Sequence, residues 1–508
     1  MTDALWTLLF AQIAMGAFDT IWHHEGTERL AWRPGQRTEL RLHGVRNLAY
    51  ALLFLALGFT RPQGLWAAAL MLLLAGEMII TLWDFVEEDR TRRLPASERI
   101  THTLLTLNYG ALLALLLPWL WQGVGQATAL VPADHGLAGW LCALAAAGVM
   151  GSGLRDLAAA QRAPQLVDAP AAGLASALPG RQHLLITGGT GFIGQRLVAA
   201  LAAAGHDVTI LSRSATAPAV SGTGRVKMVT NLATVPADCR IDAIVNLAGE
   251  PISDRPWTRA KRIRIIRSRL AVTRAVVALI DRLDHKPAVL VSGSAIGIYG
   301  LQNDDFLDEN AAGRPCFSAR VCRNWEAAAA RASTRTVMLR TGLVLDRSGG
   351  LLSRLLAPFE FGLGGRLGSG RQWMSWIHRD DLVRLIIHAI ANEQISGPLN
   401  ATAPHPVTNA EFTRTLGQLL RRPTLIPVPA APLTALLGDF ARELLLGGQR
   451  VQPSAALASG FRFRHPSLAG ALAAITGQPD PQRAALQAAA RSLAAICDGQ
   501  VDTGRAPA

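Results

Sequence analysis

Cysteine is scarce in this chain of 508 residues. The five cysteines are Cys142, Cys239, Cys316, Cys322 and Cys497, and none of them forms a Cys-x-x-Cys pair. Their number is odd and they lie far apart in the sequence. This pattern argues against a disulfide framework and favours reduced thiols in a cytoplasm.

Acidic residues are also few, since 37 Asp and Glu stand against 50 Lys and Arg, and the formal net charge is +13. A basic chain can bind nucleic acid, but here the arginines are spread out and the few aromatic residues do not interleave with a basic run. We therefore expect no nucleic-acid partner. The excess charge reflects arginine usage and a positive bias next to a membrane.

The N-terminus lacks a basic start and no small-residue cleavage site precedes Asp19, so we expect no cleaved signal peptide. Hydrophobic residues make up 50% of the chain, and the apolar excess lies in residues 1–155. Because about 20 apolar residues cross a bilayer, we interpret this part as an α-helical membrane domain of about five spans. The apolar runs are residues 4–22, 45–59, 65–83, 104–121 and 137–150, of which the second and fifth are short and need their flanks.

The loops between these runs predict an orientation. Residues 23–46 contain five arginines and residues 84–101 contain four, whereas residues 60–64 and 122–136 contain only Arg61. Positive loops stay on the cytoplasmic side. Five spans then place the N-terminus outside and the rest of the chain in the cytoplasm, which predicts a multi-pass protein of a bacterial-type inner membrane, with the lipid bilayer as a partner.

Histidines and acids gather near the cytoplasmic ends of the predicted spans. Asp19 with His23, and Glu98 with His102, are pairs four residues apart on one helical face, a spacing that suits metal ligands. Imidazole and carboxylate together suit iron, zinc or manganese. The alternative is a solvated face with salt bridges to the arginines. An acid inside a span is costly and is a functional candidate, and Glu77 is one. The hypothetical ligands are His23, His24, His43, Glu77, Glu88 and His102.

Residues 156–181 contain alanine and proline without a periodic apolar face, so we expect a flexible or partly extended linker. Short β-rich runs then alternate with helical runs, which predicts an α/β Rossmann-type, doubly wound parallel sheet. We expect strands at 208–211, 226–229, 243–247, 288–291 and 337–339, and helices at 257–282 and 320–331. The expected domains are 182–420 for this sheet, with elements of a substrate subdomain interleaved from about 341, then a small α+β domain at 421–475, and a helix and tail at 476–508.

A glycine-rich turn at 187–194 follows the first strand of this region and opens a helix. Backbone N–H groups in such a turn and at a helix N-terminus hold a pyrophosphate. The next strand ends at Ser212 and Arg213, where an NAD-binding protein would have an acid. Because an arginine can pair with a 2′-phosphate, NADP(H) is favoured. The predicted cofactor residues are Gly188, Thr190, Gly191, Phe192, Ile193, Gly194, Ser212, Arg213, Leu247, Ala248, Gly249 and Arg269.

Residues 183–475 resemble the extended short-chain dehydrogenase/reductases, and among them the epimerase-like (NAD-dependent epimerase/dehydratase) branch that ends in a small C-terminal domain of unknown function. The resemblance covers nearly 60% of the chain and none of the membrane part. It implies a nucleotide cofactor and a small-molecule substrate. The segments that carry it are 187–194, 246–252, 292–295, 325–326, 340–342, 364–370, 375–382, 397–400, 406–409, 422–423, 427–429, 448–453 and 460–463.

The chain departs from this pattern at the residues that move protons. Ordinary members use Tyr-x-x-x-Lys, in which the lysine lowers the pKa of the tyrosine. Here Asn303, not lysine, stands four residues after Tyr299, and the helix that should carry the pair reads Cys-Arg-Asn-Trp-Glu at 322–326. We expect Asp381 to cap a helix that starts at Leu382. The remaining catalytic candidates are Ser294, Tyr299, Cys322, Glu326, His378 and Asp380.

Three functions are consistent with these patterns. The first is a membrane-tethered, NADP(H)-binding epimerase or oxidoreductase that acts on a small carbonyl, nucleotide-sugar-like or lipophilic substrate. The second is a non-catalytic NADP(H) sensor that regulates the membrane domain. The third is a metal-dependent membrane enzyme with the Rossmann domain as its partner. The sequence does not identify protein partners.

Overall fold

The computed structural model describes residues 2–213 and 222–481. The chain divides into two compact units, residues 1–167 and 168–508. The helix expected at 482–496 and the tail that follows it lie outside the described residues.

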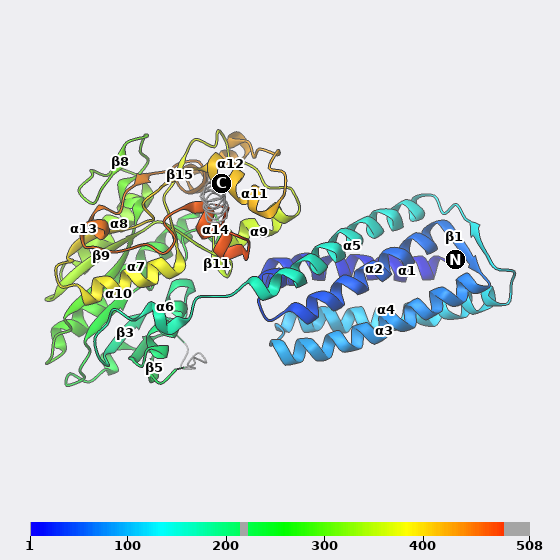
Figure 1. Ribbon diagram of the computed structural model, residues 1–508, viewed down its shortest axis with the longest axis horizontal. Coiled ribbons are helices and arrows are strands. Elements are labelled where there is room, and N and C mark those ends of the chain that lie inside the picture. Colours follow the sequence, from blue (N-terminus) through cyan, green and yellow to red (C-terminus); the bar gives the residue numbers. More distant parts are fainter. Residues whose placement is uncertain (1, 214–221, 482–508) are drawn as a thin grey trace, which may run out of the picture. The chain divides into compact units, whose positions relative to one another are not determined.

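The first unit is a bundle of long apolar helices (Figure 1). Within the described residues, five helices are long and apolar enough to cross a membrane, in agreement with the five predicted runs. The two short runs are extended by their flanks, because α2 begins at Arg37 and α5 continues to Arg162. The helices are α1 (Asp3–Phe18), continued by a π-helical segment (Asp19–Glu28), α2 (Arg37–Phe59), α3 (Leu65–Thr91), α4 (Ala96–Val124) and α5 (Leu137–Arg162).

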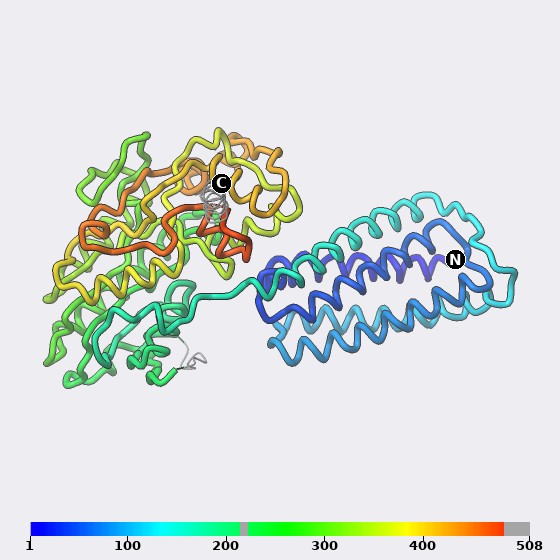
Figure 2. The backbone as a smooth tube through the Cα atoms, in the orientation of Figure 1, coloured from blue at the N-terminus to red at the C-terminus, as the bar shows by residue number. Residues whose placement is uncertain are grey.

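Helices α2 and α5 approach each other closely at small residues. A Cβ atom on Gly58 would lie 2.8 Å from the Cβ of Cys142, and one on Gly139 would lie 2.7 Å from the carbonyl oxygen of Gly58. Close backbone contact of this kind is typical of helix pairs that pack in lipid. Figure 2 shows the bundle as a tube, with the two connections that carry β1 (Thr60–Gln63) and β2 (Ala129–Pro132) paired at one end.

The expected linker is more ordered than the sequence indicated. Residues 156–162 complete α5. Leu174, Ala175 and Leu178 are buried in the core of the second unit. These three apolar side chains are too few to give a periodic run, although Leu174 and Leu178 are four residues apart, and they are stabilised by packing on α6 (Phe192–Ala203) and α10 (Arg379–Ala391).

The second unit is built on a parallel sheet of seven strands among the described residues, in the order β5-β4-β3-β6-β7-β9-β14. This confirms the predicted doubly wound sheet, and the strands expected from the sequence are present. The chain starts in the middle at β3, moves outward to β5, and then returns to β6 on the other side of β3. The strands are β3 (His183–Thr187), β4 (Asp207–Leu211), β5 (Val226–Val229), β6 (Ala243–Asn246), β7 (Val289–Ala295), β9 (Arg335–Thr341) and β14 (Gly397–Ala401).

Helices cover both faces of this sheet. On one face, Ile186 and neighbouring strand residues pack against α6 (Phe192–Ala203) and α10 (Arg379–Ala391). On the other face, Leu185 and Ile244 pack against α7 (Arg259–Arg282), and α8 (Phe317–Ala329) contacts α7. Successive strand residues point to opposite faces, and both faces are buried, so the strands read as continuous apolar runs.

The remaining elements form short sheets and helices after β7. The strand β10 pairs parallel with β13, and β8 pairs parallel with β16, which joins segments far apart in the sequence. The elements are β8 (Phe306–Leu307), β10 (Leu343–Asp346), β11 (Gly349–Gly350), α9 (Leu352–Glu360), β12 (Trp373–Met374), β13 (Trp376–His378), β15 (Val407–Thr408), α11 (Asn409–Leu420), α12 (Ala430–Leu437), β16 (Arg450–Val451), α13 (Ser454–Ala458) and α14 (Leu468–Thr476).

Candidate functional site

The glycine turn lies at the point where the order of the strands reverses. Thr187 ends β3 and is in register with Asn246, which ends β6 on the neighbouring strand. The Thr187 hydroxyl donates to the Asn246 side chain (2.7 Å) and accepts from the N–H of Ala248 (3.1 Å). In open parallel sheets, ligands bind in the crevice at the carboxyl ends of the strands. The crevice lies between the two neighbouring strands whose following connections run to opposite sides of the sheet. Both predicted cofactor loops, 188–194 and 247–249, therefore meet at one place.

Three glycines of the turn allow backbone contacts that a side chain would block. Gly188 has a φ of +72°, and a Cβ there would lie 2.9 Å from the nitrogen of Ala248. A Cβ on Gly194 would lie 2.1 Å from the carbonyl oxygen of Gly188. Gly191 is the N-cap of α6 and offers no side chain to its first turn. The amides of Phe192 and Ile193 are thus left for an anion, because the first N–H groups of a helix have no partner within it.

Arg213 follows the next strand at the same edge. Leu211, the last residue of β4, is in register with Thr187, and the exposed Arg213 lies two residues beyond it. Its position is consistent with the predicted contact to a 2′-phosphate. Arg269 is more constrained, because its guanidinium donates to the carbonyl oxygens of Glu250 (2.9 Å) and Ile265 (3.1 Å) and lies over the ring of Trp325. Burial lowers the pKa of Arg269.

A polar network starts at Ser294, at the carboxyl end of β7. The Ser294 hydroxyl donates to Glu326 on α8 (2.6 Å). Arg340 on β9 holds both oxygens of this carboxylate, through Nε and Nη2 at 3.0 Å each. Arg340 also donates to the oxygen of Tyr299 (3.1 Å), and the Tyr299 hydroxyl donates to Asn400 (2.7 Å).

No sequence pattern identifies Arg340 as the partner of Glu326. The structure brings them together because Ser294 and Arg340 are in register on neighbouring strands, while Glu326 comes from the helix above them. Ser294 and Arg340 are each less than one-tenth exposed. The ion pair therefore lies in a largely desolvated place where a carboxylate requires a partner.

Two of the predicted catalytic residues are buried beside this network. Tyr299 is fully buried and its phenol is committed to Asn400, and burial raises its pKa. Cys322 lies one helical turn before Glu326, and burial raises its pKa to about 11. A thiol with such a pKa is a poor nucleophile near neutral pH. These placements leave Ser294, at the carboxyl end of β7, and its partner Glu326 as candidates.

His378 has a structural position at the start of α10. Its Nδ1 accepts a hydrogen bond from the N–H of Asp380 (3.1 Å), so His378, and not Asp381, is the N-cap. Burial, together with the ring of His465 stacked at 4.1 Å, lowers the pKa of His378 to about 4. Asp380 forms a two-point ion pair with Arg196 (2.7 and 2.8 Å).

The expected cap at Asp381 is wrong, because α10 begins at Arg379 and Asp381 lies inside its first turn. The Asp381 carboxylate instead accepts hydrogen bonds from the backbone of Arg464 (2.9 Å) and His465 (2.8 Å). It therefore ties the C-terminal segment to α10.

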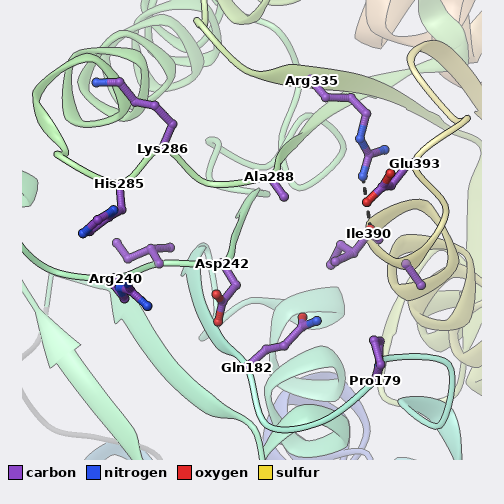
Figure 3. A pocket seen from close by; sticks show the side chains of 12 residues that line it. Pro179, Gln182, Arg240, Asp242, His285, Lys286, Ala288, Arg335, Ile390 and Glu393 are labelled. Atoms are coloured by element: carbon purple, nitrogen blue, oxygen red, sulfur yellow. Dashed lines mark hydrogen bonds between the residues drawn. The ribbon is translucent and has the colours of Figure 1, made fainter.

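A cavity of about 700 Å³ lies at the opposite edge of the sheet (Figure 3). Gln182, Asp242, Ala288 and Arg335 line it, each at or just before the amino end of a strand. Arg335 donates to the carbonyl oxygen of Ile390 and so closes one side of it. The cavity is far from the glycine turn in the topology of the sheet, and parallel sheets bind their ligands at the carboxyl edge.

In the first unit, the structure brings most of the predicted metal ligands together. His24, His102 and Glu88 belong to a set completed by Glu98, which the sequence pairs with His102 but which is not among the predicted ligands, and His43 belongs to a second set with Glu39 and Glu88. His23 uses both ring nitrogens elsewhere, on Asp19 (2.9 Å) and Ser97 (3.3 Å). Glu77 is also separate, since its carboxylate accepts from Tyr50 (2.6 Å), Thr81 (2.7 Å) and Tyr109.

The sheet, its strand order and the glycine turn define a dinucleotide-binding domain of the doubly wound class. Residues 184–401 match the NAD dependent epimerase/dehydratase family, and residues 428–475 match a domain of unknown function, DUF1731. Epimerase family protein Mb2239 of Mycobacterium bovis is 42% identical over 297 residues, which cover 58% of this chain and 97% of that protein. The human epimerase family protein SDR39U1 is 39% identical over 295 residues, which cover 57% of this chain and 98% of that one.

The crystal structure of human SDR39U1 (isoform 2) with NADPH superposes with a TM-score of 0.53 at 36% identity, covering 58% of this chain and 99% of that one. The chain therefore belongs to the epimerase/dehydratase family, with the DUF1731 domain at its C-terminal end. This confirms the family inferred from the sequence motifs.

Proposed function

We propose that residues 182–475 bind NADP(H) at the carboxyl edge of the sheet. The observation that carries this proposal is the glycine turn at the reversal of strand order, with an uncapped helix α6 behind it. The human relative whose structure contains NADPH supports the same choice of cofactor. Gly188–Gly194 would hold the pyrophosphate, and residues 247–249 would lie along the other side.

A substitution of Arg213 tests whether the protein prefers NADP(H), the cofactor with the 2′-phosphate, to NAD(H). An arginine–phosphate hydrogen bond contributes about 1.5–3 kcal/mol, but Arg213 is exposed, so we take the low end. Arg213→Ala should raise the dissociation constant of NADPH about tenfold and leave that of NADH unchanged, as measured by titration calorimetry on the full chain. Arg331→Ala is the matched control, because Arg331 is also exposed but precedes β9 at the opposite edge. An equal effect on both nucleotides would contradict the assignment.

The chemistry we propose is reduction, oxidation or epimerisation of a small carbonyl-containing substrate, for which the nicotinamide supplies hydride transfer. Ser294 and Glu326 would contact the substrate in place of the missing Tyr-x-x-x-Lys pair. The Ser294 hydroxyl already donates to Glu326. In the oxidative direction, the substrate hydroxyl would therefore give its proton to the Ser294 oxygen while the serine passes its own proton to the Glu326 carboxylate. Reduction would run the same relay in reverse. If this is right, Ser294→Ala should lower NADPH consumption about a hundredfold while the affinity for NADPH stays unchanged.

A second candidate is a non-catalytic NADP(H) sensor. It is favoured by the burial of Tyr299 and Cys322, which leaves no titratable tyrosine facing the nucleotide among the residues described here. The two candidates separate on a panel of aldehydes, ketones and nucleotide sugars. Binding of NADPH without its consumption on any of them supports the sensor and contradicts the enzyme.

We further propose that the first unit spans a bilayer and tethers the second unit on the cytoplasmic side. Large apolar side chains point outward from the bundle, among them Leu72 (74% exposed), Leu107 (68%) and Leu144 (72%). Such a surface suits lipid better than water. The protein should sediment with membranes and resist extraction by high salt but not by detergent. Release by salt alone would contradict the proposal.

A further inference from the structure

The first unit contains a buried cluster of histidines and acids at one end of its helices. His24 belongs to the π-helical segment that continues α1, Glu88 ends α3, and Glu98 and His102 begin α4. One ligand atom from each of these four residues lies within 4.8 Å of the others. We call them the four-ligand set. Three of the four are buried, and His102 is nearly so.

We propose that the four-ligand set binds a divalent first-row transition metal ion. Mixed imidazole and carboxylate ligands suit iron, manganese or zinc. Metal–ligand bonds of about 2.0–2.2 Å place two ligands on one ion at most about 4.4 Å apart. Neighbouring ligands of a tetrahedral ion lie about 3.3–3.6 Å apart, so atoms that lie within 4.8 Å of one another must close in by at most about 1.5 Å, which rotations of the His and Glu side chains can supply.

The first support is a buried nitrogen without a hydrogen bond. His24 is 6% exposed, and its Nε2 makes no hydrogen bond to the described residues. The nearest carboxylate oxygens are those of Asp19 at 3.3 Å and Glu98 at 3.7 Å. A buried polar atom without a partner is rare and costly. A metal ion between His24 and Glu98 would supply the missing contact.

The second support is the orientation of His102. Its Nε2 is hydrogen-bonded to Asp19 (3.2 Å), while its Nδ1 faces Glu88 Oε2 at 3.5 Å. Metal-binding histidines usually donate their other ring N–H to a carboxylate, which fixes the tautomer and aims the free lone pair at the metal. Asp19 therefore orients His102 for binding without being one of the four ligands.

The third support is the balance of charge. Five buried carboxylates, Asp19, Glu39, Asp84, Glu88 and Glu98, lie close together, and the guanidinium groups paired with them are Arg46 and Arg92. Three negative charges are left to be balanced. A buried charge without a partner costs several kcal/mol, and a cation bound close to the carboxylates would offset that cost.

Protonated histidines are the alternative source of positive charge. The rings of His24 and His43 stack face to face, with centroids 4.6 Å apart and planes within 4°. Two imidazolium rings in this arrangement would repel each other, so at most one of them is protonated, and His43 is the better placed because its Nε2 lies 3.0 Å from Asp84. A neutral His24 that binds a metal ion avoids this repulsion. His43 also joins Glu39 and Glu88 in the second set, so Glu88 is the residue common to both.

The test is metal content of the full chain, purified in detergent from cells grown with iron, manganese and zinc. We expect at least one equivalent of one of these metals per chain by mass spectrometry. Glu88→Gln and His102→Ala should abolish it, and Asp19→Asn should weaken binding about 10- to 100-fold. Glu77→Gln is the matched control, because Glu77 is an equally buried acid on the same helix whose partners are Tyr50, Thr81 and Tyr109.

A second measurement guards against misfolded variants. The chelator-treated wild-type chain is titrated with MnCl2 and followed by electron paramagnetic resonance, and only preparations with unchanged elution and helical circular dichroism are compared. Saturable binding that His24→Ala removes and Glu77→Gln preserves supports the site. Metal well below one equivalent together with no saturable Mn²⁺ binding by the wild type would overturn it, as would binding that all variants share.

Discussion

The ion pair between Glu326 and Arg340 gives a prediction with a definite size. The carboxylate and guanidinium side chains are 13% and 10% exposed and make two hydrogen bonds of 3.0 Å. Removing one member of a buried pair costs about 3–5 kcal/mol, because the other charge is left without a partner. Since a little solvent reaches this pair, we expect Glu326→Gln to lower the free energy of unfolding by about 3 kcal/mol.

This loss should be visible as a decrease of about 5–10 °C in the melting temperature of the second unit. The assay is thermal unfolding of the full chain in detergent, followed by circular dichroism. Arg340→Met removes the charge from the other side, and the double variant should be more stable than the sum of the two single losses predicts. We expect a coupling energy of about 2 kcal/mol from this cycle.

The affinity for NADPH is the internal control, because Glu326 does not contact the glycine turn. It should change less than tenfold in Glu326→Gln. A loss of stability below about 1 kcal/mol, which is the range of exposed pairs, would refute the reasoning. Strictly additive single losses would refute it as well, because they would show that the two groups do not stabilise each other.

Two further predictions concern stability. The pKa of His378 is lowered from 6.5 to about 4, so its contribution is fully present above pH 6.5 and is lost as the pH falls towards 4. That contribution is about 3 kcal/mol. His378→Asn can still cap α10, and in melts at a series of pH values it should lose less stability than the wild type between pH 6.5 and 4. The control His285→Asn, at an exposed histidine, should lose as much as the wild type. Gly58→Val should lower the stability of the first unit by about 1–3 kcal/mol in a detergent melt, because its Cβ would meet Cys142 at 2.8 Å. Gly76→Val, with nothing within 4 Å, should be neutral.

Much of the second unit follows from local sequence pattern. The strands are apolar runs bounded by glycine and polar residues, and the turn at Gly188 needs a positive φ that glycine adopts easily. The reversal of strand order places residues 247–249 beside that turn, so the two cofactor loops could be predicted to meet. The five helices of the first unit could also be predicted, because the length and hydropathy of an apolar run are properties of consecutive residues.

Contacts between distant segments could not be predicted in this way. Glu326 and Arg340 meet only because α8 packs above the register of β7 with β9. The cap of α10 is His378, three residues before the predicted Asp381, because the His378 Nδ1 accepts a hydrogen bond from the N–H of Asp380 as an aspartate oxygen would. Leu174 and Leu178 lie in a segment without periodicity, and only packing against α6 and α10 shows that they belong to the core.

The Ser294–Glu326–Arg340 network and the cluster around the four-ligand set differ in a way that bears on function. In the second unit, Glu326 faces Arg340, so one negative charge meets one positive charge and the network is complete without a ligand. In the first unit's cluster the buried carboxylates outnumber the arginines paired with them, and His24 Nε2 has no hydrogen bond to any residue that the structure describes. A complete network stabilises the fold by itself, whereas an incomplete one is stable only when something else supplies charge and contacts. The first unit is therefore where a bound cation would change stability most, and adding Mn²⁺ to the metal-free chain should raise the melting temperature of the first unit while leaving that of the second unit unchanged.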